Sequence, residues 1–146
     1  KIITKEDISF GYRYTTLKDK YIILNVTFLL TKGDTEETKK EILERNIKRN
    51  NTQPLDKKNV GSIFRNPEGY AAGKLIEDLG FKSHQIGGAK VSEKHANFIV
   101  NEDNATCEDV IKLIEEIKIK VKDNYNKELE SIYKKRRDFC NIKTME

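Results

Sequence analysis

The most apolar stretch of the chain lies near its N-terminal end. Residues 21–30 (YIILNVTFLL) are almost all branched or aromatic, and Lys32-Gly33-Asp34, a sequence typical of a turn, follows them. Branched and aromatic residues bounded by turn formers are characteristic of β-strands. The pattern therefore predicts a buried strand over residues 21–30.

A helix is predicted directly after this strand, from Asp34 or Thr35 to about Asn50. The short polar side chains at its start suit a helix cap, and Glu36 and Glu37 would lie at the positive end of the helix dipole. The apolar side chains of this segment are only Ile42, Leu43 and Ile47. So thin an apolar seam indicates a helix that lies on a surface and does not cross a core.

Gln53-Pro54-Leu55 ends this helix, because proline has no amide hydrogen and restricts the residue before it. We place a domain boundary there. Residues 61–69 (GSIFRNPEG) are dense in turn formers, and a short helix is predicted over residues 71–79, stopped by Gly80. Residues 85–89 (QIGGA) are predicted to form a loop.

A short strand over residues 97–101 (NFIVN) and a long helix complete the pattern. Thr106 and Asp109 have the spacing of a capping box at the start of that helix. Apolar residues then recur at helical spacing at Val110, Ile111, Leu113, Ile114, Ile117 and Val121. This stripe is typical of core packing. Strands mixed with helices, without a regular βαβ alternation, predict an α+β fold.

Composition narrows the class of protein. Hydrophobic and charged residues each make up 36% of the 146 residues, and no apolar run approaches the roughly 18–20 residues that cross a bilayer, which excludes a membrane-spanning protein. Cys107 and Cys140 show no CxxC or Cys/His spacing, so we expect reduced thiols and no metal site. The net charge is +4, but basic and acidic residues alternate, which favours solvated helix faces.

Two segments contain candidate catalytic residues. In FGYR at 10–13, Arg13 follows aromatic residues and offers a fixed cationic fork for a carboxylate or phosphate, although the local sequence alone favours an ordinary edge arginine. In GSIFRNP at 61–67, Ser62 follows a glycine, and its hydroxyl is suited to donating a proton. Arg65 and Asn66 add donors for an anionic ligand. A structural serine in a turn remains an alternative, and no GxSxG elbow predicts a hydrolase.

A third segment contains adjacent glycines. Gly87 and Gly88 could expose backbone amides to a phosphate beside nearby lysines, or simply shape a turn. We interpret His95 as a structural or surface histidine. Residues 134–137 (KKRR) form a basic cluster, interpreted as a solvated end of the chain.

In this order the segments resemble the C-terminal part of the UDP-N-acetylenolpyruvoylglucosamine reductases, bacterial flavoenzymes also called UDP-N-acetylmuramate dehydrogenases. The matching stretches are FGYR at 10–13, QPL at 53–55, GSIFRNPEGYAAGKLIEDLGFK at 61–82, IGGAKVSEKHANFIVN at 86–101, and NAT with EDV within 104–110. The resemblance runs from about residue 6 to 130. Without a long insertion after GSIFRNP, the spacing is similar to the shorter form of the family.

The resemblance implies a reaction. The family transfers a hydride from NADPH to FAD and then to the enolpyruvyl group of UDP-N-acetylglucosamine enolpyruvate, giving UDP-N-acetylmuramate for peptidoglycan synthesis in the cytoplasm. Ser62 matches the family's proton donor, and Arg13 matches the arginine that stabilises the enolate-like intermediate. Asn66 matches an asparagine that contacts the substrate diphosphate. The other residues expected to bind this substrate are Arg65, Gly87 and Gly88.

The C-terminal end departs from the family pattern. The family ends in a Leu-Glu-x-Glu-Val-Arg strand whose second glutamate is catalytic, whereas here Leu129-Glu130-Ser131 is followed by Ile132. Glu130 lies two residues early, on the same strand face as Ile132 by alternation, so the catalytic role is not transferred to it. Residues 132–146 therefore depart from the pattern.

The resemblance also implies two domains. Residues 1–53 would be the last strand and helix of the second flavin-binding domain, and residues 54–146 the substrate-binding domain. The family's FAD-binding region would lie mostly before Lys1, so we expect the chain to be a piece of a longer protein. By itself it should bind FAD weakly or not at all and be inactive. Its expected partners are that N-terminal region and the UDP-sugar, with neither nucleic acid nor a membrane.

A second hypothesis comes from a different class of protein. A non-enzymatic module would use the +4 charge and the basic cluster at 134–137 to bind nucleic acid or an anionic surface. Such binding would weaken steeply with salt. The acidic residues interspersed along the chain argue against it.

Overall fold

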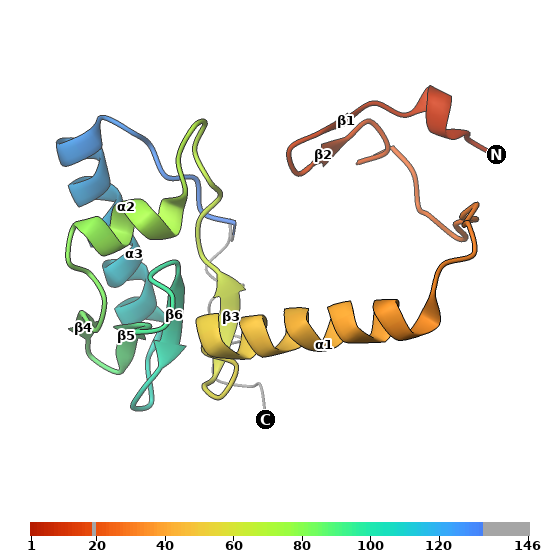
Figure 1. The fold of residues 1–146 in the computed structure, drawn as a ribbon. Coiled ribbons are helices and arrows are strands. Elements are labelled where there is room, and N and C mark those ends of the chain that lie inside the picture. Colours follow the sequence, from red (N-terminus) through yellow and green to blue (C-terminus); the bar gives the residue numbers. More distant parts are fainter. Residues whose placement is uncertain (19, 133–146) are drawn as a thin grey trace. The chain divides into compact units, whose positions relative to one another are not determined.

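A computed structural model describes residues 1–18 and 20–132, and its contacts divide the chain into two units, Lys1–Thr35 and Glu36–Glu146 (Figure 1). Helices and antiparallel sheets are mixed within the described residues, which confirms the α+β class. The predicted division into domains at residues 53 and 54 stays a prediction. None of the helices in the described part of the chain has the length and apolar character to cross a bilayer.

The first unit contains a small hairpin. After a 3₁₀ turn, η1 (Lys5–Asp7), strands β1 (Phe10–Gly11) and β2 (Tyr14–Thr15) pair antiparallel, with Phe10 opposite Thr15. Tyr12 and Arg13 form the two-residue turn between them. Arg13 has φ +53°, a left-handed conformation that few residues other than glycine adopt.

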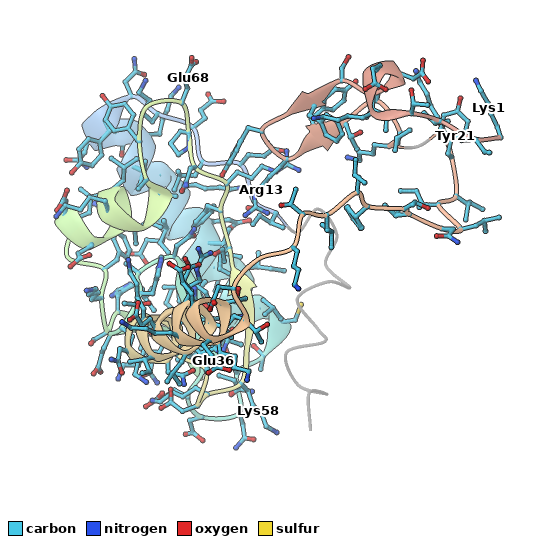
Figure 2. All side chains as sticks on the ribbon, turned by 45° about the vertical axis from the view of Figure 1, so that its right-hand side comes forward. Lys1, Arg13, Tyr21, Glu36, Lys58 and Glu68 are labelled. Atoms are coloured by element: carbon cyan, nitrogen blue, oxygen red, sulfur yellow. The ribbon has the colours of Figure 1, made fainter. Side chains whose placement is uncertain are left out.

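The predicted buried strand over residues 21–30 is wrong. This segment has no regular secondary structure, and its side chains are exposed, with Leu24 at 93% and Leu29 at 101% of full exposure. A strand needs a neighbour to accept and donate its backbone hydrogen bonds, and none of the described strands pairs with this segment. Figure 2 draws the segment between Tyr21 and the start of α1 as a trace without helix or strand.

The predicted surface helix is confirmed as α1 (Thr35–Thr52). None of its side chains is buried, and even the three apolar residues of its seam are about half exposed. The helix ends two residues before Pro54, as the loss of a backbone amide requires.

A four-stranded antiparallel sheet forms the centre of the second unit. Its strands are β3 (Asn59–Ser62), β6 (Phe98–Asn101), β5 (Ala89–Val91) and β4 (Gln85–Ile86), in that spatial order. The predicted strand over 97–101 is confirmed as β6. The predicted loop over 85–89 is wrong, because its ends are the paired strands β4 and β5 and only the two glycines make the turn.

Two helices cover this sheet. The predicted short helix is α2 (Ala72–Asp78), which Gly80 follows with φ +76°. The long helix α3 (Cys107–Tyr125) contacts β4, β5 and α2 (Figure 1). Thr106 and Asp109 form the predicted capping box. The largest fully buried side chains come from these elements and from the segment after β3: Phe64, Ile63, Ile76, Ile99, Leu113 and Ile117.

The last described residues pair with the segment that follows β3. The N–H of Arg65 donates to the carbonyl of Glu130 at 2.9 Å, and the N–H of Ile132 donates to the carbonyl of Ile63 at 2.8 Å. The basic cluster at 134–137 and Cys140 lie outside the described residues.

Candidate substrate-binding site

A bulge at the end of β3 determines where Ser62 lies. The pairing of β3 with β6 shifts register between Asn59 and Ser62, and Gly61 has φ +85°. The side chain of Asn59 accepts the Gly61 N–H at 2.8 Å. No atom lies within 4 Å of the position that a Gly61 Cβ would occupy, so the backbone conformation alone requires glycine here. Such a bulge commonly redirects the side chain that follows it.

Ser62 lies at the edge of the core, opposite Phe98 in the strand register. The residue is half-buried, and the next two residues, Ile63 and Phe64, are fully buried. Its hydroxyl makes no hydrogen bond with any other residue that the structure describes. Within the described part of the chain, this hydroxyl is available to donate to a ligand.

Arg65 and Asn66 follow Ser62 in the segment of residues 62–66, in which Ser62 ends β3 and Phe64 pairs with Ser131. Arg65 Nη1 donates to Glu130 Oε2 at 3.0 Å, whereas Arg65 Nε is buried and has no hydrogen-bond partner within the described ranges. Asn66 Oδ1 accepts the N–H of Ala72 at 3.0 Å and so satisfies one of the free amides at the start of α2. The structure brings three of the predicted site residues together in one short segment.

The predicted substrate-binding glycines connect the β4–β5 hairpin to the start of α3. The Gly88 N–H donates to the Asp109 carboxylate at 3.3 Å, and its carbonyl accepts the Glu102 N–H at 2.9 Å. A Cβ on Gly88 would overlap the backbone of Asp103, and one on Gly87 would overlap the Asp109 carboxylate. Both glycines are thus needed for packing, and their contact with a substrate stays a prediction.

Asp109 is the acceptor that joins these elements. Its carboxylate accepts the backbone N–H of Thr106 at 2.8 Å as well as that of Gly88, while its own N–H donates to the Thr106 hydroxyl. These bonds, first of all those from Thr106, hold the pKa of Asp109 below its usual value. The carboxylate therefore stays ionised and stabilises the start of α3.

Arg13 lies in the other unit, at the turn of the β1–β2 hairpin. Its guanidinium carbon is 5.9 Å from the centre of the Tyr12 ring, a cation–π distance. Phe10, Tyr12 and Tyr14 are all more than half exposed. The prediction that Arg13 and Ser62 act on one ligand is untested, since the two residues belong to different units.

Sequence reasoning missed Asn97, which lies directly before β6 and contacts the candidate site. Its side chain is 5% exposed and bonds to both backbone groups of Phe64, and its N–H donates to His95 Nδ1 at 3.2 Å. Partial burial first, and then the charge of Lys82, lower the pKa of His95. The sequence offered one signal for this role: Asn97 is a polar residue directly before the apolar run Phe98–Val100.

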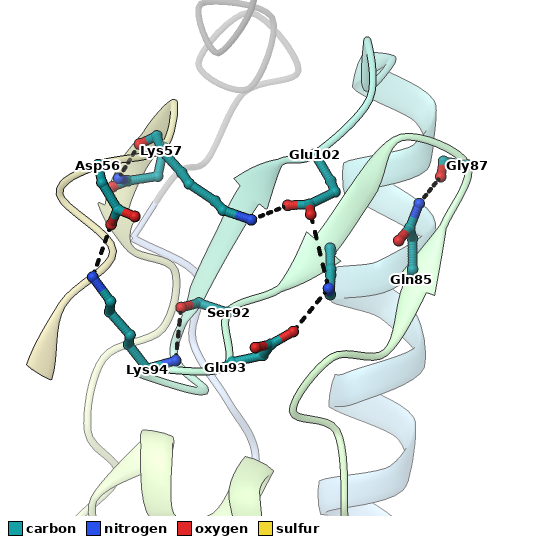
Figure 3. Close-up of polar contacts among 10 residues, drawn as sticks. Asp56, Lys57, Gln85, Gly87, Ser92, Glu93, Lys94 and Glu102 are labelled. Carbon is teal, nitrogen blue, oxygen red and sulfur yellow. Dashed lines mark hydrogen bonds and ion pairs between the residues drawn. The ribbon is translucent and has the colours of Figure 1, made fainter.

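A separate cavity of about 180 Å³ lies between the segment after α1 and strand β5. Its charged side chains are paired, as Figure 3 shows: Lys94 with Asp56 at 2.9 Å, Lys90 with Glu93 at 2.9 Å, and Lys57 with Glu102. The bond from Lys94 lowers the pKa of Asp56. Because these lysines are neutralised, the cavity gives no support to the hypothesis of a basic binding module. The described residues also group no three potential metal ligands.

The comparisons with known proteins agree with this fold. The chain superposes with a TM-score of 0.71 on the crystal structure of UDP-N-acetylenolpyruvylglucosamine reductase from Thermus caldophilus, at 33% identity, covering 88% of this chain and 46% of that one. These features define an α+β domain with the fold of part of that reductase. A family model described as UDP-N-acetylenolpyruvoylglucosamine reductase, C-terminal domain, matches residues 53–132. The chain belongs to the UDP-N-acetylenolpyruvoylglucosamine reductase family.

Curated relatives show the same relationship. The chain is 49% identical over 129 residues to the UDP-N-acetylenolpyruvoylglucosamine reductase of Caldanaerobacter subterraneus subsp. tengcongensis, covering 88% of this chain and 43% of the relative. It is 42% identical over 132 residues to that of Limosilactobacillus reuteri, covering 90% and 44%. The chain thus spans less than half the length of these relatives.

Proposed function

We propose that this chain supplies the substrate-binding part of a UDP-N-acetylenolpyruvoylglucosamine reductase, which reduces UDP-N-acetylglucosamine enolpyruvate with NADPH during peptidoglycan synthesis. One observation carries the proposal: the Ser62 hydroxyl follows a glycine bulge at the edge of the sheet, half-buried and without a partner in the described residues. Arg65 and Asn66 lie next to it and suit an anionic ligand.

The proposed role of Ser62 follows from where charge develops. FAD, when bound, supplies the hydride that reaches C3 of the enolpyruvyl group. Electron density then accumulates at C2 and on the adjacent carboxylate, and a proton must be delivered to C2. We assign that proton to Ser62 Oγ and the stabilisation of the negative charge to Arg13, whose guanidinium stays charged.

The UDP part of the substrate needs donors for its diphosphate. Arg65 presents a guanidinium that is only partly neutralised by Glu130, whose own side chain is half exposed. Asn66 is exposed at the start of α2. We assign both residues to the diphosphate, and Gly87 and Gly88 to the wall of the same site.

The cavity beside strand β5 does not fit FAD. The cavity of about 180 Å³ is smaller than the roughly 300–1,000 Å³ of typical small-molecule sites, and paired charges line it. We therefore assign FAD to the additional length that the relatives have. Residues 21–30, apolar yet exposed, fit a partner region that supplies the missing strand neighbour and covers them. The chain by itself is then expected to be inactive, and the working enzyme to be cytoplasmic, where NADPH is available.

Titration of the isotope-labelled chain with UDP-N-acetylglucosamine enolpyruvate tests the proposal. We expect saturable NMR shifts at the backbone amides of residues 62–66, and none when a DNA oligonucleotide replaces the UDP-sugar. UDP-N-acetylglucosamine, which lacks the enolpyruvyl group, serves as a second control and should shift the amides of Arg65 and Asn66 more than that of Ser62. No shift at millimolar ligand would contradict a binding function of this chain.

A change at Ser62 tests the catalytic assignment in a full-length protein that contains this chain. Ser62→Ala should slow product formation strongly and leave the reduction of FAD by NADPH at its normal rate. Ser83→Ala, at an exposed turn after α2, is the matched control and should affect neither step. Equal loss of both steps in Ser62→Ala would indicate a structural serine.

A further inference from the structure

The side chain of Asn97 adds one hydrogen-bonded pair to the central sheet, and we call this pair the Asn97 rung. Asn97 Oδ1 accepts the N–H of Phe64 at 2.9 Å, and Asn97 Nδ2 donates to the carbonyl of Phe64 at 2.9 Å. The carbonyl of Asn97 also accepts the N–H of Ile63 at 2.9 Å. The amide side chain thereby reproduces the two-bond exchange of an antiparallel pair, in a place that is 5% exposed.

The Asn97 rung lies directly beyond the last paired residues of strands β3 and β6. The last register pair between β3 and β6 is Ser62 with Phe98. On the other side, the segment ending at Ile132 bonds to the carbonyl of Ile63 and the N–H of Arg65, which leaves the N–H and carbonyl of Phe64 facing β6. Without Asn97 these two groups would be buried and unpaired, an arrangement that folded proteins avoid.

Asn97 fixes the backbone of Phe64, which lies between the residues proposed to bind the substrate. Phe64 separates Ser62 from Arg65, and its side chain is buried. The two bonds to its backbone therefore determine the path of the chain from Ser62 to Arg65. The side-chain hydrogen bonds of Asn97 go to the backbone of Phe64 and not to the Ser62 hydroxyl or the Arg65 guanidinium. Any effect of Asn97 on a ligand must therefore pass through the conformation of residues 62–66.

Asn97 is itself held in place by the tight connection between β5 and β6. Its N–H donates to His95 Nδ1, and the N–H of Phe98 donates to the His95 carbonyl at 3.0 Å. A Cβ on Gly73 in α2 would lie 2.9 Å from the His95 ring, so close packing holds this connection from the opposite side. The side-chain amide is thus oriented before any ligand arrives.

We propose that Asn97 is a positioning residue, which holds the segment of residues 62–66 in the conformation that binds the UDP-sugar. The inference rests on the proposed function. Loss of the side-chain amide should weaken ligand binding even in molecules that remain folded. Residues 62–66 would then sample conformations in which Ser62, Arg65 and Asn66 no longer face the ligand together.

The test compares two variants of the full 146-residue chain, with UDP-N-acetylglucosamine enolpyruvate as the probe. Asn97→Ala removes the rung, and Val121→Ala removes buried volume from α3, where Val121 is fully buried. Both are measured by NMR titration at a temperature where urea unfolding shows each variant to be folded. We expect Asn97→Ala to raise Kd about tenfold or more, equivalent to about 1.4 kcal/mol, and Val121→Ala to leave Kd unchanged.

Asn97→Asp provides a conservative rescue. Its protonated carboxyl offers the same donor and acceptor as the amide, whereas the ionised form has lost the donor to the Phe64 carbonyl. Affinity should approach that of the unaltered chain at pH 5 and fall as pH rises to 8. The unaltered chain, titrated at both pH values, corrects for the ligand and for His95, the titratable side chain next to Asn97.

The outcomes separate the two claims. A Kd for Asn97→Ala within twofold of the unaltered chain, or an equal loss of affinity in Val121→Ala, would overturn the positioning role while the proposed function stands. An Asn97→Asp variant with no pH dependence beyond that of the unaltered chain would also overturn it. Absence of binding by the unaltered chain would overturn the proposed function and this inference together.

Discussion

Arg65 and Glu130 are 65 positions apart in the chain, yet Arg65 Nη1 lies 3.0 Å from Glu130 Oε2, and the Arg65 N–H donates to the Glu130 carbonyl. The pair joins the segment after β3 to the last described residues. It also places a carboxylate beside the guanidinium that we assign to the substrate diphosphate. Glu130 and the diphosphate would therefore compete for the same positive charge.

Glu130→Gln is expected to strengthen binding of the UDP-sugar. The change removes a negative charge that repels the ligand and partly neutralises Arg65. Because the Glu130 side chain is 53% exposed, the free energy of unfolding should fall by less than about 1 kcal/mol. Isothermal titration calorimetry measures the affinity. Glu128→Gln, which removes an equal charge from the exposed pair with Lys122, is the control and should change Kd little. Weaker binding in Glu130→Gln would contradict the assignment of Arg65.

Gly88→Ala is expected to destabilise the second unit severely. A Cβ at Gly88 would overlap the backbone of Asp103 and Ala105, and backbone cannot rotate away as a long side chain does. We expect a loss of about 3 kcal/mol or more, at the upper end for overpacking. Gly80→Ala is the control: Gly80 has φ +76°, and no atom lies within 4 Å of the position that its Cβ would occupy, so only a conformational strain of about 1–2 kcal/mol applies. Urea unfolding measures both, and equal losses would show that the overlap is relieved.

His95 is expected to make stability depend on pH near neutrality. Its pKa is lowered in the folded chain, so the unfolded chain binds a proton more readily below about pH 6.5. The free energy of unfolding should therefore fall as pH decreases from 6.5 through the lower folded pKa. Protonation of Nδ1 also removes the acceptor for the Asn97 N–H.

Urea unfolding at pH 7.5 and 5.5 of the unaltered chain and of His95→Gln isolates this contribution. Carboxylates whose pKa is also lowered, such as Asp109 and Glu102, contribute equally to both proteins and cancel in the difference. The unaltered chain should lose more stability than the variant. Equal losses would show that another group causes the pH dependence.

The exposed segment over residues 21–30 is expected to cause self-association of the chain. Apolar residues with unpaired backbone groups form a template for pairing with another copy. Leu24→Lys should reduce the concentration-dependent association measured by sedimentation and leave the unfolding of the second unit unchanged. Ile119→Lys, at an isolated exposed position of α3, is the control. A chain that is monomeric at all concentrations, with or without Leu24→Lys, would contradict this expectation.

The sequence by itself determined the elements whose causes are local. The capping box of Thr106 and Asp109 and the apolar stripe after it predicted α3, because both depend on residues three or four positions apart. The end of α1 before Pro54 and the stop of α2 at Gly80 were likewise predicted from single residues. The resemblance to the reductase family, which the comparisons confirm, rested on contiguous motifs of the same kind.

Only the tertiary structure decided the features that depend on distant partners. The largely apolar sequence over residues 21–30 predicted a buried strand, but a strand exists only where a neighbour completes its hydrogen bonds, and the described residues offer none. The glycine pair predicted either a phosphate-binding loop or a turn, and its contact with a substrate stays a prediction. Contacts with Asp109 of α3 and with the backbone of Asp103 and Ala105 before it explain why neither position tolerates a Cβ. Asn97 reaches Phe64, 33 residues earlier, through hydrogen bonds that no local pattern encodes. Burial and pairing across the sheet are properties of the assembled chain, and they set the geometry of the site.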